Sequence, residues 1–485
     1  MSALTLSIIP EAAEVLAGAS MPVRVVLTNA GSAPAEVPST VASYAFQFPV
    51  RSEASPSKAR VLSVQNALIA ARPDPRPMPK MTTSLAPGAK LEYELDLGAL
   101  AIPPLEPGRY RLFVAYPEGG QSIESPGVPL TIVGPRIGAL ASAMAADGTT
   151  LSLVYTHAAT SGEAIVYQQE NLVDSAGSPD KGTAYARGRA APPQAVAAVA
   201  TAVEPRSARG PRWHSWLQGE ALGAAATRDK AQYIAVPPMP VGLRGPVLQT
   251  VGWQPTGDSA VFALLGMDSQ NRVALAIVTF SIEGKGAVQT VPLGIAGMPS
   301  RWAVSYAPAD SGRFEVVTAA SSAGGTRFQQ HSVSTASRTV TQSRVLAERR
   351  EPIAAIALEP VAADPAPSLD ILLGPHGSPP QMTYLRLALA EGPPLAEFSF
   401  NVPPETARTA AGWVLGRSAG GEAVLVARMG DQVIGRWLTP TGRGFVLDAK
   451  AAGAAHLRLH AVAQAVWAIW SEPGLGLRYG KLPAP

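Results

Sequence analysis

The clearest fold signal lies in residues 247–293, which read VLQTVGWQPTGDSAVFALLGMDSQNRVALAIVTFSIEGKGAVQTVPL. Short apolar runs alternate here with turn residues such as Thr256-Gly257-Asp258, and the runs cover residues 247–253, 260–265, 273–280 and 287–293. Apolar runs of this length, bounded by Gly, Pro, Asp and Ser, are typical of β-strands joined by tight turns. The stretch therefore predicts one four-stranded antiparallel sheet.

Similar units recur from Gly134 to the end of the sequence. They start near residues 137, 193, 246, 300, 353, 409 and 455. Four-stranded units repeating at roughly 50 residues resemble the blades of β-propellers, in which each sheet buries its faces only against its neighbours. We expect seven blades, although six or eight also fit, because the unit at 193–240 is degenerate and the last has three strands. No helical pattern of useful length appears, and the nearest candidate, Pro193 to Val203, is interpreted as a strand.

Residues 1–134 carry a different pattern. Leu4 to Ile8, Leu91 to Leu97 and Gly108 to Tyr116 alternate between apolar and polar residues. Such alternation places apolar side chains on one face of a strand and polar ones in water. The pattern predicts a β-sandwich of seven or eight strands, so the chain is expected to be all-β, with a sandwich at 1–134 and a β-propeller at 135–485.

The first region resembles bacterial immunoglobulin-like or fibronectin-like modules. The resemblance is carried by Val23 to Asn29, by the Leu85-Ala86-Pro87-Gly88 turn, and by the Leu105-Glu106-Pro107-Gly108-Arg109-Tyr110 stretch that precedes a strand. It implies an immunoglobulin-like fold in which Tyr110 is a core tyrosine. A fold of this kind says little about function.

The composition excludes several kinds of chemistry. The sequence has no cysteine, so disulfides, thiolate metal sites and thiol nucleophiles are ruled out. Charged residues make up 15% of the chain, against about 25% in typical soluble domains. The net charge of +3 is spread along the chain and lacks interleaved aromatic residues, so nucleic acid is not an expected partner. No cofactor is expected either.

Targeting signals are not visible. The start, Met1 to Leu6, has neither a basic segment nor a long apolar one, and no apolar run approaches the length of a membrane-spanning helix. We therefore expect synthesis in the cytoplasm and no membrane insertion. Membership of an extracellular or virion-like particle is compatible with this expectation.

Two catalytic motifs match by letter only. Gly416-Arg417-Ser418-Ala419-Gly420 fits G-x-S-x-G, but a nucleophile elbow requires a helix after the serine, and a strand is expected there. Ser55-Pro56-Ser57-Lys58 fits S-x-x-K but falls in a proline-containing loop rather than on a helix. We therefore assign no catalytic residue.

Histidines give no metal site. Of the six, only His456 and His460 are close in sequence, and no third ligand is paired with them. The sequence predicts no metal.

Two loops are candidates for contact with partners. One is a proline-stiffened loop that carries Arg72, Arg76 and Lys80, and the other is a cationic loop that carries Arg206, Arg209 and Arg212. Prolines reduce the entropy lost when a loop docks. These six residues form the predicted binding set.

The sequence favours a non-enzymatic structural or binding protein, with the propeller as a docking scaffold and the immunoglobulin-like module as a tether. By analogy with the same pairing of domains, we expect it to be a component of a larger bacterial or phage-like assembly. An alternative is a carbohydrate-active propeller, either a lectin or a glycoside-cleaving enzyme, in which tryptophans and at least two carboxylates converge on one face. A scaffold for intracellular protein partners is a third possibility.

Overall fold

The structure is a computed structural model. It describes residues 4–39, 46–54, 59–63, 82–98, 100–101, 105–118, 121–134, 136–144, 149–174, 179–180, 182, 184–190, 196–202, 212–227, 233–249, 259–306, 313–322, 325–358, 368–418, 420–451, 453–462, 465–473 and 475–485. The chain divides into two compact units. Unit one is Met1–Pro135 with Thr183–Ala186, and unit two is Arg136–Gly182 with Arg187–Pro485.

Unit one is built from strands only, as far as it is described. Its strands are β1 (Leu4–Pro10), β2 (Glu14–Leu16), β3 (Pro22–Asn29), β4 (Ala35–Pro38), β5 (Gln47–Ser52), β6 (Ala59–Ser63), β7 (Thr82–Leu85), β8 (Lys90–Asp96), β9 (Gly108–Leu112), β10 (Ala115–Glu118), β11 (Gln121–Glu124) and β12 (Val128–Val133). One sheet has the order β1-β3-β8, a larger one has the order β11-β10-β5-β9-β12-β2 with β6 on β5, and β4 pairs with β7.

Aromatic rings connect the two larger sheets of unit one. Buried Phe46 lies 5.0 Å from the Tyr93 ring on β8 and 5.5 Å from the Tyr116 ring on β10. Tyr93 donates a hydrogen bond to the carbonyl of Pro38, and burial raises the pKa of Tyr93 to about 12. The core tyrosine is therefore Tyr93. Tyr110 is only half-buried, and its hydroxyl donates to the carbonyl of Glu106.

The stretch Gly108 to Tyr116 is divided into β9 and β10 rather than forming one strand. Both strands pair with β5 in one register, but their other neighbour changes from β12 to β11. At the break, the Val114 amide donates to the hydroxyl of Ser125. Alternation of apolar residues did not reveal the break because it records which face a side chain occupies and carries no information about the neighbouring strand.

Unit two consists of antiparallel sheets, each made of consecutive strands. Among the described residues there are six four-stranded sheets and then a three-stranded one. The first three sheets comprise β13 (Ile137–Met144), β14 (Thr150–Ala158), β15 (Ala164–Leu172) and β16 (Ala184–Ala190); β17 (Val196–Ala202), β18 (Arg212–Gln218), β19 (Ala221–Thr227) and β20 (Tyr233–Pro240); and β21 (Arg244–Gln249), β22 (Ser259–Met267), β23 (Val273–Ser281) and β24 (Gly286–Pro292).

The remaining sheets continue in the same way. They comprise β25 (Arg301–Tyr306), β26 (Arg313–Ser322), β27 (Gly325–Ser334) and β28 (Thr339–Arg349); β29 (Ile353–Leu358), β30 (Ser368–His376), β31 (Gln381–Ala388) and β32 (Ala396–Asn401); β33 (Ala410–Arg417), β34 (Ala423–Met429), β35 (Gln432–Trp437) and β36 (Gly444–Asp448); and β37 (Ala455–Val462), β38 (Ala465–Glu472) and β39 (Gly476–Lys481).

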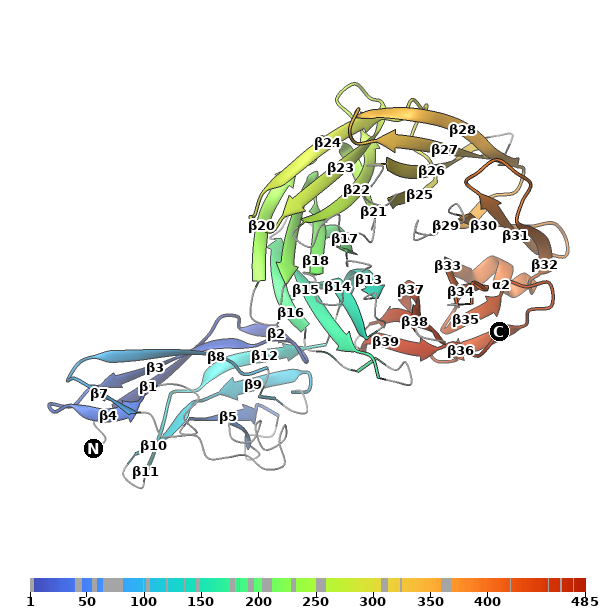
Figure 1. The fold of residues 1–485 in the computed structure, drawn as a ribbon. Coiled ribbons are helices and arrows are strands. Elements are labelled where there is room, and N and C mark those ends of the chain that lie inside the picture. The colour runs from blue at the N-terminus through green and yellow to red at the C-terminus, as the bar shows by residue number, and fades with distance from the viewer. Residues whose placement is uncertain are drawn as a thin grey trace. The chain divides into compact units, whose positions relative to one another are not determined.

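These sheets form a closed ring in which the first strand of each sheet faces the centre (Figure 1). Contacts join β13 to β17, β17 to β21, β25 to β29, β29 to β33 and β33 to β37, and β37 of the last sheet contacts β13 of the first. The first strands start at 137, 196, 244, 301, 353, 410 and 455, each within about three residues of the start expected from a propeller repeat. Unit two is therefore a β-propeller.

The region interpreted as degenerate, 193–240, forms a regular sheet. Its strand β19 is rich in alanine, and Trp216 on β18 lies against Gly188 and Gly223, where a Cβ would overlap the indole. The strand interpretation of Pro193 to Val203 is confirmed by β17.

Apolar side chains pack between adjacent sheets. Between the second and third sheets, Trp213 and Phe280 stack at 6.4 Å between ring centroids, and Phe262 contacts Phe280. A second cluster around Trp437 and Trp470 joins the sixth and seventh sheets. Because each sheet buries both faces against neighbours, its middle strands are almost continuously apolar.

A short helix, α2 (Pro404–Thr409), connects β32 to β33. It begins with Pro404 and carries Glu405 in its first turn and Arg408 in its last turn, which are ordinary helix signals. Six residues are too few for a visible 3.6-residue period, so the helix was not expected from the sequence. No helix among the described residues has the length and apolar character that crossing a bilayer requires.

Candidate functional site: a cationic central cavity in the propeller

Most of the predicted binding set lies outside the described residues. Arg72, Arg76, Lys80, Arg206 and Arg209 belong to this group. Arg212 is the first residue of β18, and its guanidinium lies 2.5 Å from the Glu170 carboxylate of β15, with 15% of the side chain exposed. This ion pair joins the first two sheets of the propeller. The role of the six residues in binding stays a prediction.

A cavity of about 580 Å³ occupies the centre of the ring and is lined by the first strand of every sheet. Its polar and aromatic lining includes Ser142, Arg301, Trp302, Trp413 and Arg458. Among the described residues that line it there are two guanidinium groups and no carboxylate. The central cavity is therefore a positively charged environment.

Arg301 is placed at the cavity by β25, of which it is the first residue. Its side chain is exposed, and one Nη atom donates to the carbonyl of Ser300. Two of the three donor nitrogens of the guanidinium are not used in this bond. Arg301 can therefore pair with an anion that enters the cavity.

Arg458 has a structural role in the same cavity. Its Nη atoms donate to the carbonyl of Leu457 at 2.7 Å and to the carbonyl of Leu140 on β13 at 2.5 Å. Next to it, His460 Nε2 lies 2.6 Å from Ser142 Oγ. Arg458 and His460 thus hold the last sheet against the first, and burial, with Arg458 nearby, lowers the pKa of His460 to about 4.

Buried carboxylates of the propeller are already paired with other groups. The Asp370 side chain, on β30, is 4% exposed and accepts two bonds from Arg417 on β33, at 2.8 and 2.5 Å. The hydroxyl of Tyr384 donates to the same carboxylate at 2.6 Å. Each oxygen of Asp370 therefore accepts a strong hydrogen bond, which holds the carboxylate between β30 and β33.

Glu315 of the fourth sheet is held in a similar way. Its carboxylate pairs with Arg313 at 2.8 Å and accepts hydrogen bonds from Gln330 and Ser332. Neither Glu315 nor Asp370 lines the central cavity. A glycoside-cleaving site requires tryptophans and carboxylates that converge on one face. Trp302 and Trp413 line the central cavity, but no carboxylate among the described residues lines it with them.

Two histidines of the propeller, His214 and His331, are buried. His331 lies 2.9 Å from Ser343 Oγ, and burial lowers the pKa of His331 to about 4. His214 is fully buried, and burial, with Arg187 and Arg212 nearby, lowers the pKa of its imidazole to about 3. Across the described part of the chain, no three groups of the kind that hold a metal come together.

The G-x-S-x-G stretch forms the hairpin between β33 and β34. The hydroxyl of Ser418 donates to the carboxylate of Glu422, and the Glu422 amide donates back to that hydroxyl. No helix follows the serine, because residues from Ala423 onward continue as a strand. The interpretation of this motif as a turn is confirmed, whereas the S-x-x-K stretch at 55–58 lies outside the described residues.

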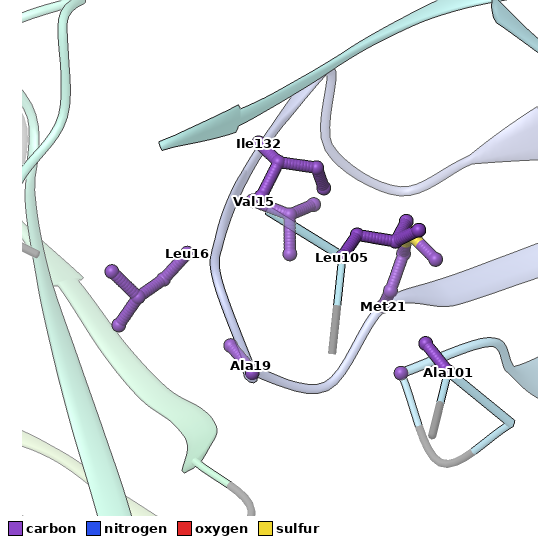
Figure 2. Close-up of a pocket in the computed structure, with 9 residues that line it drawn as sticks. Val15, Leu16, Ala19, Met21, Ala101, Leu105 and Ile132 are labelled. Carbon is purple, nitrogen blue, oxygen red and sulfur yellow. The ribbon is translucent and has the colours of Figure 1, made fainter. Parts of the chain in front are cut away.

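Unit one contains one small cavity worth noting. Val15, Met21, Leu105 and Ile132 gather around it from different segments of unit one, whereas the Leu16 side chain points away from them (Figure 2). Its volume of about 20 Å³ holds at most one water, and its lining residues are apolar side chains and glycines. It is a packing gap and not a ligand site.

The central cavity was not predicted from the sequence, where the charged loops were the more visible feature. Arg301 and Arg458 stand on first strands, which face the centre of a propeller. Arginines on first strands were the available signal, although Arg244 and Arg417 also stand on first strands and do not line the cavity.

No protein-family model matches this chain, and no curated protein matches its sequence. Solved structures with related folds include the WD40 domain of SCAP from fission yeast, which is 10% identical, covers 72% of this chain and 84% of that chain, and gives a TM-score of 0.41. Another is the Aleuria aurantia lectin in complex with alpha-methyl-L-fucoside, at 10% identity, 66% and 97% coverage, and a TM-score of 0.37.

A third is a puromycin hydrolase, at 13% identity, 72% coverage of this chain and 52% of that chain, with a TM-score of 0.44. The three differ in what their names state, and likenesses this distant carry no argument about function. The identification of unit two as a β-propeller rests on its own ring of sheets.

Proposed function

We propose that this protein is a non-enzymatic binding protein whose propeller receives an acidic segment of a partner protein in its central cavity. The observation that carries the proposal is the charge of that cavity, with Arg301 and Arg458 in its lining and no carboxylate among the described lining residues. Electrostatic complementarity of this kind steers and selects partners. The pairing of Asp370 and Glu315 with arginines supports a structural rather than a catalytic use of buried carboxylates.

The proposal includes the finer organisation of the chain. Each of the sheets described in unit two is one blade, which gives seven blades, and unit one is an immunoglobulin-like tether that ends near residue 134. The protein is made in the cytoplasm and belongs to a larger bacterial or phage-like assembly. Sedimentation of native particles tests this last point, since a protein that always migrates as a free 50.1 kDa monomer is not part of one.

Binding in the cavity is tested with a fluorescein-labelled hexaglutamate peptide. Arg301→Glu reverses an exposed charge without touching the contacts that close the ring, whereas Arg458 is avoided because it holds β37 to β13. Arg443→Glu, an exposed arginine outside the cavity lining, is the matched control. We expect salt-sensitive binding by the wild type and by the control, and none by Arg301→Glu. Equal binding by all three proteins contradicts the proposal.

A lectin is the second candidate, because Trp302 and Trp413 line the same cavity. Indole rings stack on sugar rings and need no carboxylate for binding alone. A glycan array discriminates between the two candidates: specific hits that disappear in Trp413→Ala favour the lectin, and an empty array favours the acidic partner.

A further inference from the structure

We propose that a second site, between the fifth and sixth propeller sheets, binds a small apolar carboxylic acid, with Arg436 pairing with the carboxylate. The site is a pocket formed by β32 and α2 on one side and by all four strands of the sixth sheet on the other (Figure 1). We call it the α2 pocket. It is distinct from the central cavity, and Trp413 lines both.

The lining of the α2 pocket is mostly apolar. Phe400, Met429, Ile434 and Phe445 contribute to it, and Val446, which is 56% exposed, also lines it. The volume is about 290 Å³, enough for about ten water-sized groups at about 30 Å³ each. A ligand of about ten non-hydrogen atoms with an apolar body therefore fits.

Among the described residues that line the α2 pocket, Arg436 is the one with a charged side chain. Its guanidinium carbon lies 4.6 Å from the centroid of the Phe400 ring. Its Nε atom is buried and has no hydrogen-bond partner among the described residues. Burial also lowers the pKa of Arg436, although a guanidinium keeps its proton at any physiological pH.

Other arginines between the propeller sheets differ from Arg436 in having anionic or carbonyl partners. Arg417 pairs with Asp370, Arg212 pairs with Glu170, and Arg344 donates to Gln330 and to the carbonyl of Leu389. A partly buried guanidinium without such a partner is costly, because desolvation of a charge is not compensated. A bound carboxylate supplies a counter-charge to this guanidinium.

The walls of the pocket are held by specific contacts. Phe445 lies over Gly435, where a Cβ would overlap its ring. Thr406 of α2 donates to the sulfur of Met429 at 3.1 Å, which fixes the helix against β34. The pocket is therefore preformed, and binding of a ligand does not cost the entropy of ordering its walls.

These features select the class of ligand. The single cation requires an anionic group, and a carboxylate matches the fork of donors on a guanidinium. The apolar walls require that the rest of the molecule be uncharged, and the small volume excludes a folded segment of another protein. Short-chain and medium-chain fatty acids and arylalkanoic acids meet all three conditions.

The test measures binding of octanoate and of octanol by ligand-detected NMR to the full chain. The two probes share an apolar chain and differ in the charged head. We expect octanoate to bind the wild type and octanol to bind at least about tenfold more weakly, since a hydrogen-bonded charge contributes more than a tenfold factor in affinity.

Two variants and one control complete the test. Arg436→Gln removes the charge, and Gly444→Val fills the pocket at a strand position where a Cβ meets only the carbonyl of Gly435, at an ordinary 3.7 Å. The affinity of both variants for octanoate is expected to fall about tenfold or more, while their melting temperatures stay at the wild-type value. Arg443 is exposed and lies outside the pocket, so Arg443→Gln is expected to bind octanoate like the wild type.

The proposal is overturned if octanoate does not bind the wild type, or if folded Arg436→Gln binds octanoate and octanol as the wild type does. Loss of binding in Gly444→Val together with retention in Arg436→Gln also overturns it, because the pocket then binds apolar chains without using the charge. If Arg436→Gln does not fold, Gly444→Val and the comparison of octanoate with octanol decide the question.

Discussion

Removal of Arg417 should destabilise the propeller far more than removal of an equally close but exposed ion pair. Arg417 bonds the Asp370 carboxylate at 2.8 and 2.5 Å, and the two side chains are 13% and 4% exposed. In Arg417→Ala the carboxylate keeps the hydroxyl of Tyr384 as its one remaining partner among those described. Leaving a buried charge without its counter-ion costs about 3–5 kcal/mol.

The matched control is Arg327→Ala. Arg327 lies 2.7 Å from Glu348, but the two side chains are 59% and 61% exposed, so its loss costs at most about 1 kcal/mol. Urea unfolding followed by tryptophan fluorescence measures both free energies. All eight tryptophans, the first at 213, belong to unit two, so the signal reports on the propeller alone.

A double variant separates charge from packing. Asp370→Asn removes the charge that Arg417 neutralises, so Asp370→Asn combined with Arg417→Ala should cost less than the sum of the two single changes. If Arg417→Ala lowers the free energy of unfolding by no more than Arg327→Ala does, the buried pair does not stabilise the ring and the reasoning is refuted.

Three further predictions concern stability. Acid should destabilise the propeller, because in the folded state His214, His331 and His460 have pKa values of about 3, 4 and 4, below the ordinary 6.5. Below pH 6.5 the unfolded chain therefore binds more protons than the folded chain, and the stability present above pH 6.5 is lost as the pH falls towards 4. Urea midpoints that do not change between pH 7.5 and 4.5 would contradict this. Tyr479→Phe removes the hydroxyl that accepts a bond from Asn171 across the first and last sheets, and we expect a loss of about 1 kcal/mol, measured by urea unfolding against wild type. Phe262→Ala deletes a fully buried ring between the second and third sheets, and the expected loss is about 3–5 kcal/mol; a melting temperature within a degree of wild type rules out the packing described there.

The ring of sheets was predictable because its signal is local and repeated. Each sheet is made of consecutive strands, so short apolar runs and turn residues suffice to place its strands, and the expected run at 273–280 falls within β23 (Val273–Ser281). The division of β9 from β10 was not predictable, since it depends on which strands lie on either side.

The candidate sites depended on the tertiary structure for a different reason. Arg301 and Arg458 are 157 residues apart in number, and they line one cavity only because the ring returns its last sheet to its first. Arg436 looks like any other strand arginine in the sequence. Its lack of an acceptor is visible only once β32, α2 and the sixth sheet enclose it.

Local patterns were enough to predict an all-β chain with a repeated sheet in its larger part, because alternation of apolar residues and turn chemistry act over a few neighbouring residues. Which charges are neutralised and which are open to a ligand could be read only from the folded ring. Electrostatic pairing joins residues from different sheets, and their distances depend on how the whole ring closes.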